Sequence, residues 1–101
     1  MPVALRTAAA ERDLVEIAFQ IAVRDGRPEI AEENVRNLIG KCERLAELSP
    51  ISTLGTEAPE IGINVRLISH KRWVIVFRYM EDGIIVLRIA DGSQDYLSWK
   101  L

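Results

Sequence analysis

Few residues of this chain could form a metal centre, a disulfide or a membrane anchor. It has one cysteine, Cys42, and one histidine, His70. A single cysteine excludes an internal disulfide, and one cysteine with one histidine cannot form a Cys/His zinc site within one chain. No stretch approaches the roughly 20 consecutive apolar residues that cross a membrane. Glu11, Arg12 and Asp13 interrupt the region where a secretory signal would be apolar. We therefore expect a cytoplasmic protein without a cofactor.

The chain is also short and carries little net charge. Its 101 residues carry a formal charge of −2, and 49% of them are hydrophobic. That apolar fraction excludes a disordered chain. The length suits one domain, 1–101, with one core, since domains usually span about 100–150 residues. The pI near 5.4 argues against broad nucleic-acid binding, although it is compatible with a local basic face.

The first half of the chain has the pattern of a short strand followed by two helices. Residues 3–6 form the short strand, and Thr7 follows at the N-cap of a first helix that ends near 25–26. Pro28 opens a second helix as a favoured first residue, and this helix closes at 49–50. The connection is short, so the two helices form an antiparallel hairpin. The apolar face of the first helix consists of Ala10, Leu14, Ile17, Ala18, Ile21 and Ala22.

The second half has the pattern of β-strands. Residues 50–62 contain two prolines and two glycines without a period, so we predict a loop. Three β-rich runs follow, at 65–69, 72–80 and 83–90. The last residues, 93–101, are too short to assign. The predicted fold class is α+β, with an N-terminal strand and an antiparallel helical hairpin packed on a small antiparallel β-sheet.

Both faces of the predicted sheet are apolar, although one hairpin can cover only one. The face against the helices consists of Trp73, Ile75, Phe77 and Tyr79. The opposite face consists of Val74, Val76, Ile84 and Val86, interrupted by Arg78 and Arg88. We call this opposite side the second face. Three things could close it: the chain's own tail, a second copy of the chain, or another protein.

The two arginines of the second face need acidic partners. A desolvated guanidinium on an apolar face requires a carboxylate. Asp91 or Asp95 could supply one, and so could an acidic segment of another chain. The tail adds Tyr96 and Trp99, which either pack back onto the domain or contact a partner as binding hot spots.

No residue forms a recognisable catalytic group. His70 lies in a predicted turn beside Lys71 and Arg72, which indicates a polar turn residue and not a catalytic histidine. Cys42 falls on the apolar stripe of the second helix, which indicates a buried structural thiol. The chain has no glycine-rich phosphate loop. We predict no catalytic residue and no metal ligand.

Four segments together resemble the RelE/ParE toxin superfamily. The resemblance covers nearly the whole chain, and the order β-α-α-β-β-β with a short tail matches that fold. The segments are Thr7–Leu14, Cys42–Pro50, Arg72–Tyr79 and Val86–Gly92.

This resemblance implies a small bacterial toxin that is neutralised by an antitoxin. In this superfamily the C-terminal segment of the antitoxin covers the exposed sheet surface, so a ParD-like antitoxin is the expected partner. Tyr96 and Trp99 are candidate contacts to the toxin's target. The expected antitoxin-binding groove consists of Val65, Leu67, Val74, Val76, Arg78, Val86 and Arg88.

The superfamily has two main activities, and the resemblance favours one of them. RelE-like members cleave mRNA in the ribosomal A site, and ParE-like members poison DNA gyrase. Four basic residues of the ribonuclease branch align with positions that are not basic here. RNA cleavage needs a base, an acid and positive charge at the phosphate, so the ribonuclease is the alternative. The four positions are Val65, Leu67, Val74 and Gln94.

The ParE-like branch fits the helices and strands better. It commonly ends its last strand in a His-Gly-x-Arg-Asp pattern, where this chain has Asp91-Gly92-Ser93-Gln94-Asp95. Both the histidine and the arginine are replaced. A third possibility is therefore a non-toxic copy that only binds the antitoxin. We expect a ParE-like toxin that acts on DNA gyrase as a binding protein, without contacting a membrane or nucleic acid.

Overall fold

The computed structural model describes residues 2–101 and has the element order that the sequence predicts. A strand and two helices come first, and the remaining strands follow. A π-helical turn extends the first helix, and a 3-10 turn lies in the tail. The elements are β1 (Val3–Arg6), α1 (Ala8–Phe19), η1 (Gln20–Arg24), α2 (Pro28–Leu48), β2 (Thr56–Glu57), β3 (Arg66–His70), β4 (Trp73–Met80), β5 (Gly83–Asp91) and η2 (Tyr96–Ser98).

The Thr7 hydroxyl fixes the junction between β1 and α1. Its Oγ1 accepts a hydrogen bond from the Ala10 amide at 3.1 Å, which confirms the predicted N-cap. The same hydroxyl donates to the Leu87 carbonyl of β5 at 2.7 Å. One side chain therefore caps the helix and ties its start to the sheet.

The strands form one mixed sheet in the order β1-β5-β4-β3-β2. The pairs among β3, β4 and β5 are antiparallel, as predicted, but β1 lies parallel to β5. The small antiparallel sheet that the sequence predicts is therefore present as β3-β4-β5, and the N-terminal strand adds a parallel strand at its edge. Gly83 permits the close approach, because a Cβ there would collide with the Val3 carbonyl. The predicted loop 50–62 also contains the two-residue strand β2, which pairs with β3.

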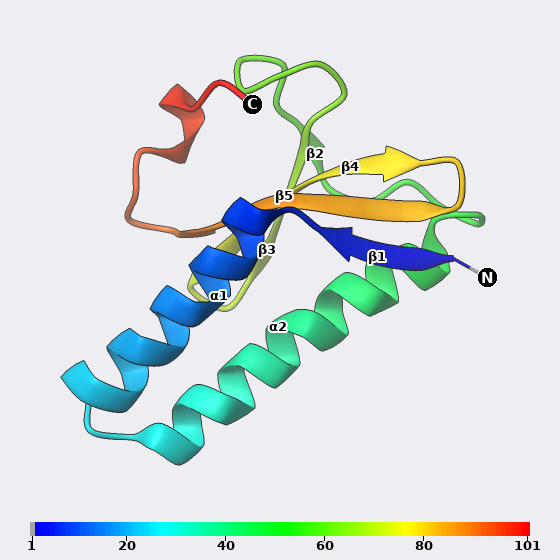
Figure 1. The fold of residues 1–101 in the computed structure, drawn as a ribbon. Coiled ribbons are helices and arrows are strands. Elements are labelled where there is room, and N and C mark those ends of the chain that lie inside the picture. Colours follow the sequence, from blue (N-terminus) through cyan, green and yellow to red (C-terminus); the bar gives the residue numbers. More distant parts are fainter. Residues whose placement is uncertain (1) are drawn as a thin grey trace.

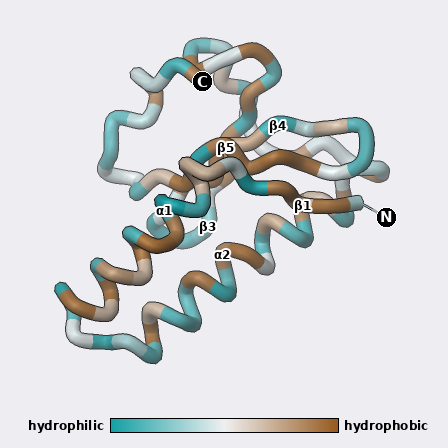
Figure 2. The backbone as a smooth tube through the Cα atoms, viewed as in Figure 1, coloured by the Kyte–Doolittle hydropathy of each residue, from teal (hydrophilic) through white to brown (hydrophobic). Residues whose placement is uncertain are grey.

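Both helices cover the same face of the sheet (Figure 1). The hydropathy of the chain follows this arrangement, with apolar residues concentrated along the central strands and α1 (Figure 2). Trp73, Ile75 and Phe77 lie in the core between the layers, which confirms the predicted helix-facing side. Tyr79 packs at its edge, and its hydroxyl accepts a hydrogen bond from the Leu54 amide at 2.7 Å.

Within residues 2–101, no helix is both long enough and apolar enough to span a bilayer.

We predict that Thr7→Ala destabilises the protein by about 1–2 kcal/mol, because it removes both the N-cap and the bond to β5. Thr7→Ser keeps the hydroxyl and is the matched control, with an expected loss well below that of the alanine variant. Urea unfolding followed by circular dichroism measures both. Equal stability of the two variants would contradict the role given to the hydroxyl.

Candidate functional site

The second face of the sheet is covered by the chain itself. The segment after β2 and the C-terminal tail fold over the side of the sheet away from the helices (Figure 1). They enclose a second apolar cluster there. Of the three ways to close this face, the structure uses the chain's own tail. The buried members are Ala58, Ile61, Val65 and Val76, and the partly buried ones are Leu67, Leu87, Tyr96 and Trp99.

A β-bulge at Leu87 decides which way the side chains of β5 point. Val76 of β4 pairs with Arg88 of β5. The next pair is Phe77 with Val86, which skips Leu87. Because the bulge inserts one residue, the alternation between faces shifts at this point.

Val86 and Ile84 therefore lie against the helices, and both are fully buried in that core. Their predicted place on the second face is wrong. Val86 accordingly lies outside the expected groove.

The other expected groove residues do lie on the second face, but they are not equally accessible. Val65 and Val76 are fully covered by the loop and the tail, and Val74 is 6% exposed. Leu67, Arg78 and Arg88 are partly exposed. Leu67, Val74 and Tyr96 line a shallow pocket of about 350 Å³ beside β2, which is the open part of this face.

Arg78 helps to hold the tail down. Its Nε donates to the Ile63 carbonyl at 2.8 Å, and its Nη2 donates to the Leu101 carbonyl at 3.3 Å. The Leu101 amide in turn donates to the Ile61 carbonyl at 2.8 Å. Residue 62 is a glycine where the tail passes closely, and a Cβ at this position would collide with the Leu101 carbonyl. Arg78 uses carbonyl partners and no side-chain carboxylate of residues 2–101.

Arg88 has an internal carboxylate partner, although not one that the sequence suggested. Asp13 of α1 accepts from its Nε at 2.7 Å and from its Nη2 at 3.0 Å. Asp13 also accepts from the Ile89 amide at 2.8 Å. The hydrogen bond to Asp13 raises the pKa of Arg88 above its usual value. The guanidinium carbon lies 4.2 Å from the ring centroid of Trp99, so Arg88 connects α1, β5 and the tail.

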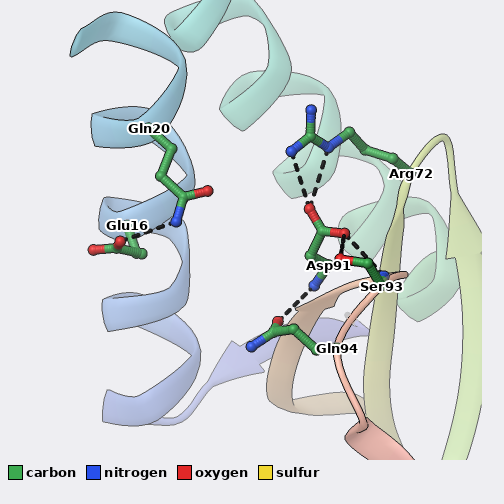
Figure 3. Close-up of polar contacts among 6 residues, drawn as sticks. All are labelled: Glu16, Gln20, Arg72, Asp91, Ser93 and Gln94. Carbon is green, nitrogen blue, oxygen red and sulfur yellow. Dashed lines mark hydrogen bonds and ion pairs between the residues drawn. The ribbon is translucent and has the colours of Figure 1, made fainter. Parts of the chain in front are cut away.

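A polar cleft lies between α1 and the end of β5 (Figure 3). It has a volume of about 510 Å³. Glu16 of α1 and Gln20 of η1 lie on one wall and are hydrogen-bonded to each other at 3.0 Å. Arg72, Asp91 and the residues just after β5 lie on the other wall, so this cleft contains the segment that aligns with the His-Gly-x-Arg-Asp pattern.

Asp91 organises the second wall of the cleft. It accepts from Arg72 Nη2 at 3.0 Å and from both the amide and the hydroxyl of Ser93 at 2.9 Å. Its own amide donates to Gln94 Oε1 at 2.8 Å. The hydrogen bonds from Ser93, followed by Arg72, hold the pKa of Asp91 below its usual value. The Asp91 carboxylate therefore stabilises the turn after β5, and the side-chain oxygen of Gln94 is used in the hydrogen bond from the Asp91 amide.

Neither of the two remaining reactive side chains points to catalysis. Cys42 is fully buried in the core, and burial raises the pKa of its thiol to about 11. Desolvation, and then Lys71 and Lys41, lower the pKa of His70, whose Nε2 has no hydrogen-bond partner among residues 2–101. Across these same residues, no group of three or more side chains could hold a metal ion.

A helical hairpin on one face of a five-stranded mixed sheet defines a small α+β fold of the ParE-like type. The family model described as the ParE toxin of the type II toxin-antitoxin system, parDE, matches residues 5–96. The chain belongs to this family, which confirms the resemblance to its ParE-like branch.

A solved structure agrees with the family assignment. The chain is similar to a chain of the chromosomal ParDE TA system from P. aeruginosa, with a TM-score of 0.72 and 25% sequence identity. The match covers 90% of this chain and 96% of that one. A comparison with curated proteins finds no match.

We predict that Asp13→Ala destabilises the protein by about 2 kcal/mol, because it leaves Arg88 without its carboxylate and the Ile89 amide without an acceptor. Asp13→Asn retains an oxygen for the Ile89 amide but loses the charge, so its loss is expected to be about half as large. Guanidinium unfolding measures both. An Asp13→Ala variant as stable as the wild type would show that the cluster around Arg88 contributes nothing.

The lowered pKa of Asp91 predicts a pH dependence of stability. The ionised carboxylate stabilises the fold above the unfolded-state pKa near 3.8, and this contribution is lost as the pH falls through the lower folded-state value. Asp91→Asn should therefore lower the urea midpoint at pH 6, and its difference from wild type should shrink as the pH falls through the folded-state pKa of Asp91. Asp95→Asn is the control, because the Asp95 carboxylate forms no hydrogen bond within residues 2–101, and only its backbone carbonyl accepts one, from the Ser98 hydroxyl. If the urea midpoints of Asp91→Asn and the wild type differed by the same amount at every pH, the stabilising role of the ionised Asp91 carboxylate would be contradicted.

Proposed function

We propose that this protein is the toxin of a type II toxin–antitoxin system and that it acts in the cytoplasm by binding DNA gyrase. The observation that supports this most is the match of the ParE toxin family over residues 5–96. A mode of action by binding agrees with the residues at the positions where the ribonuclease branch has basic groups. Val65 and Val74 are buried and apolar, and Gln94 is occupied by Asp91.

We propose a cognate, ParD-like antitoxin as the neutralising partner. The related structure from P. aeruginosa is described as a ParDE system, and its fold matches this chain at a TM-score of 0.72. The surface that suits such a partner is the open part of the second face. Its apolar floor comes from Leu67 and Val74, and Tyr96 borders it from the tail. Arg78 lies on the same face and offers a cation to an acidic segment.

Arg78 provides the sharper test of this surface. Arg78→Glu is expected to weaken antitoxin binding at least about tenfold in a calorimetric titration, because it replaces a cation beside this surface with an anion and removes hydrogen bonds that hold the tail bordering it. Arg88→Glu is a poor test, because it would place a second carboxylate against Asp13. Arg44→Glu is the control, since Arg44 is a solvated residue of α2 that pairs with Glu47. Unchanged affinity for Arg78→Glu would remove this surface from the antitoxin interface.

The target is tested by inducing the chain in a bacterial host without its antitoxin and pulse-labelling DNA and protein synthesis separately. We expect DNA synthesis to fail first and co-expression of the cognate antitoxin to restore it. Earlier failure of protein synthesis would support the ribosome-dependent ribonuclease instead. If neither process changes while the antitoxin still binds, the chain is a non-toxic copy that only binds its antitoxin.

A further inference from the structure

A second groove lies on the helix side of the sheet, away from the second face. It is bounded by η1, the start of α2 and the turn between β3 and β4, and its volume is about 570 Å³. This volume is within the usual range of ligand-binding pockets. Its floor is apolar and its rim is charged. The floor includes Ile21, Ile30 and Trp73, and the rim includes Arg27, Lys71 and Asp25.

Two cations at the rim carry unpaired charge in the part of the chain that the structure describes. Arg27 and Lys71 are exposed, and neither forms an ion pair with another of residues 2–101. Arg72 also lines the groove, but it shares its charge with Asp91. Asp25 is the one carboxylate among the lining residues. A chain with a net charge of −2 therefore has a local positive surface at this corner.

The two unpaired cations of the rim come from separate parts of the fold. Arg27 lies at the N-cap of α2, and Lys71 lies in the turn between β3 and β4. Unpaired cations from separate elements around an apolar floor match an anionic ligand that also has an apolar part.

We propose that this groove docks an acidic segment of another protein, with one apolar side chain on its floor and carboxylates beside Arg27 and Lys71. A protein segment suits the groove better than a nucleic acid does. Trp73 is only 4% exposed, so it offers no ring face on which a base could stack.

The test uses the whole protein and a random 12-residue peptide library displayed on phage. Because the protein is itself acidic, general attraction will not enrich acidic peptides. We expect the selected peptides to combine several Asp or Glu residues with one large apolar residue. The most enriched peptides are then synthesised with a fluorescent label, and their affinity is measured by anisotropy at 50 and 300 mM salt.

Two charge-reversed proteins carry the same change in net charge and separate the groove from the rest of the surface. Arg27→Glu with Lys71→Glu is expected to weaken binding at least about tenfold, and higher salt should weaken binding to the wild type. Arg36→Glu with Arg44→Glu is the control, with an expected change below about twofold, because these two residues are solvated partners of Glu32 and Glu47. Thermal unfolding checks that both variants are folded.

Three results would overturn the proposal. The first is a selected set without acidic residues, and the second is equal binding to both double variants. The third is tighter binding of a labelled 12-nucleotide DNA strand than of the peptides, with that DNA binding lost in the double variant Arg27→Glu with Lys71→Glu. This result would assign the groove to nucleic acid. None of these results depends on the toxin's target or on its antitoxin, so failure here leaves the proposed function standing.

Discussion

The carboxylate of Asp13 holds together the parts of this fold that the sheet alone does not connect. It accepts two hydrogen bonds from Arg88 and one from the Ile89 amide, and so joins α1 to the end of β5. Through Arg88 the same link reaches Trp99, which stacks on the guanidinium. The Arg88–Asp13 ion pair is partly buried, and its two hydrogen bonds add to the attraction between the charges and offset the loss of their hydration. This cluster therefore helps to hold the tail over the second face, together with the hydrogen bond from Arg78 to Leu101.

The β-bulge at Leu87 determines what that second face contains. Without it, Val86 would point away from the helices and add to an apolar surface that one tail could not cover. With it, Val86 completes the helix-side core, and the second face is reduced to a smaller cluster around Val76. The loop after β2 and the tail can cover a cluster of that size. What stays open is a shallow pocket beside Leu67 and Val74, bordered by a tail that is itself held by hydrogen bonds.

The molecule thus presents two different surfaces on opposite sides of one sheet. The second face offers an apolar strip with Arg78 beside it, and the helix side offers a groove edged by Arg27 and Lys71. Both have the apolar floor and charged rim of protein-binding sites. For a member of the ParE toxin family, this arrangement agrees with an action exerted through protein partners.

Local patterns in the sequence were enough to predict the two helices, the cap at Thr7, the three long strands and the aromatic face around Phe77. Each of these depends on residue spacing within one element, which the chain shows directly. The family was predicted from the resemblance of four segments taken together. The tertiary structure alone decided the parallel pairing of β1, the short strand β2 and the side on which Val86 lies. It also selected Asp13 over Asp91 and Asp95 as the partner of Arg88, and it brought Arg27 and Lys71 to one groove. These features join residues far apart in the chain, and a one-residue bulge reverses a face without changing the alternation that the sequence displays.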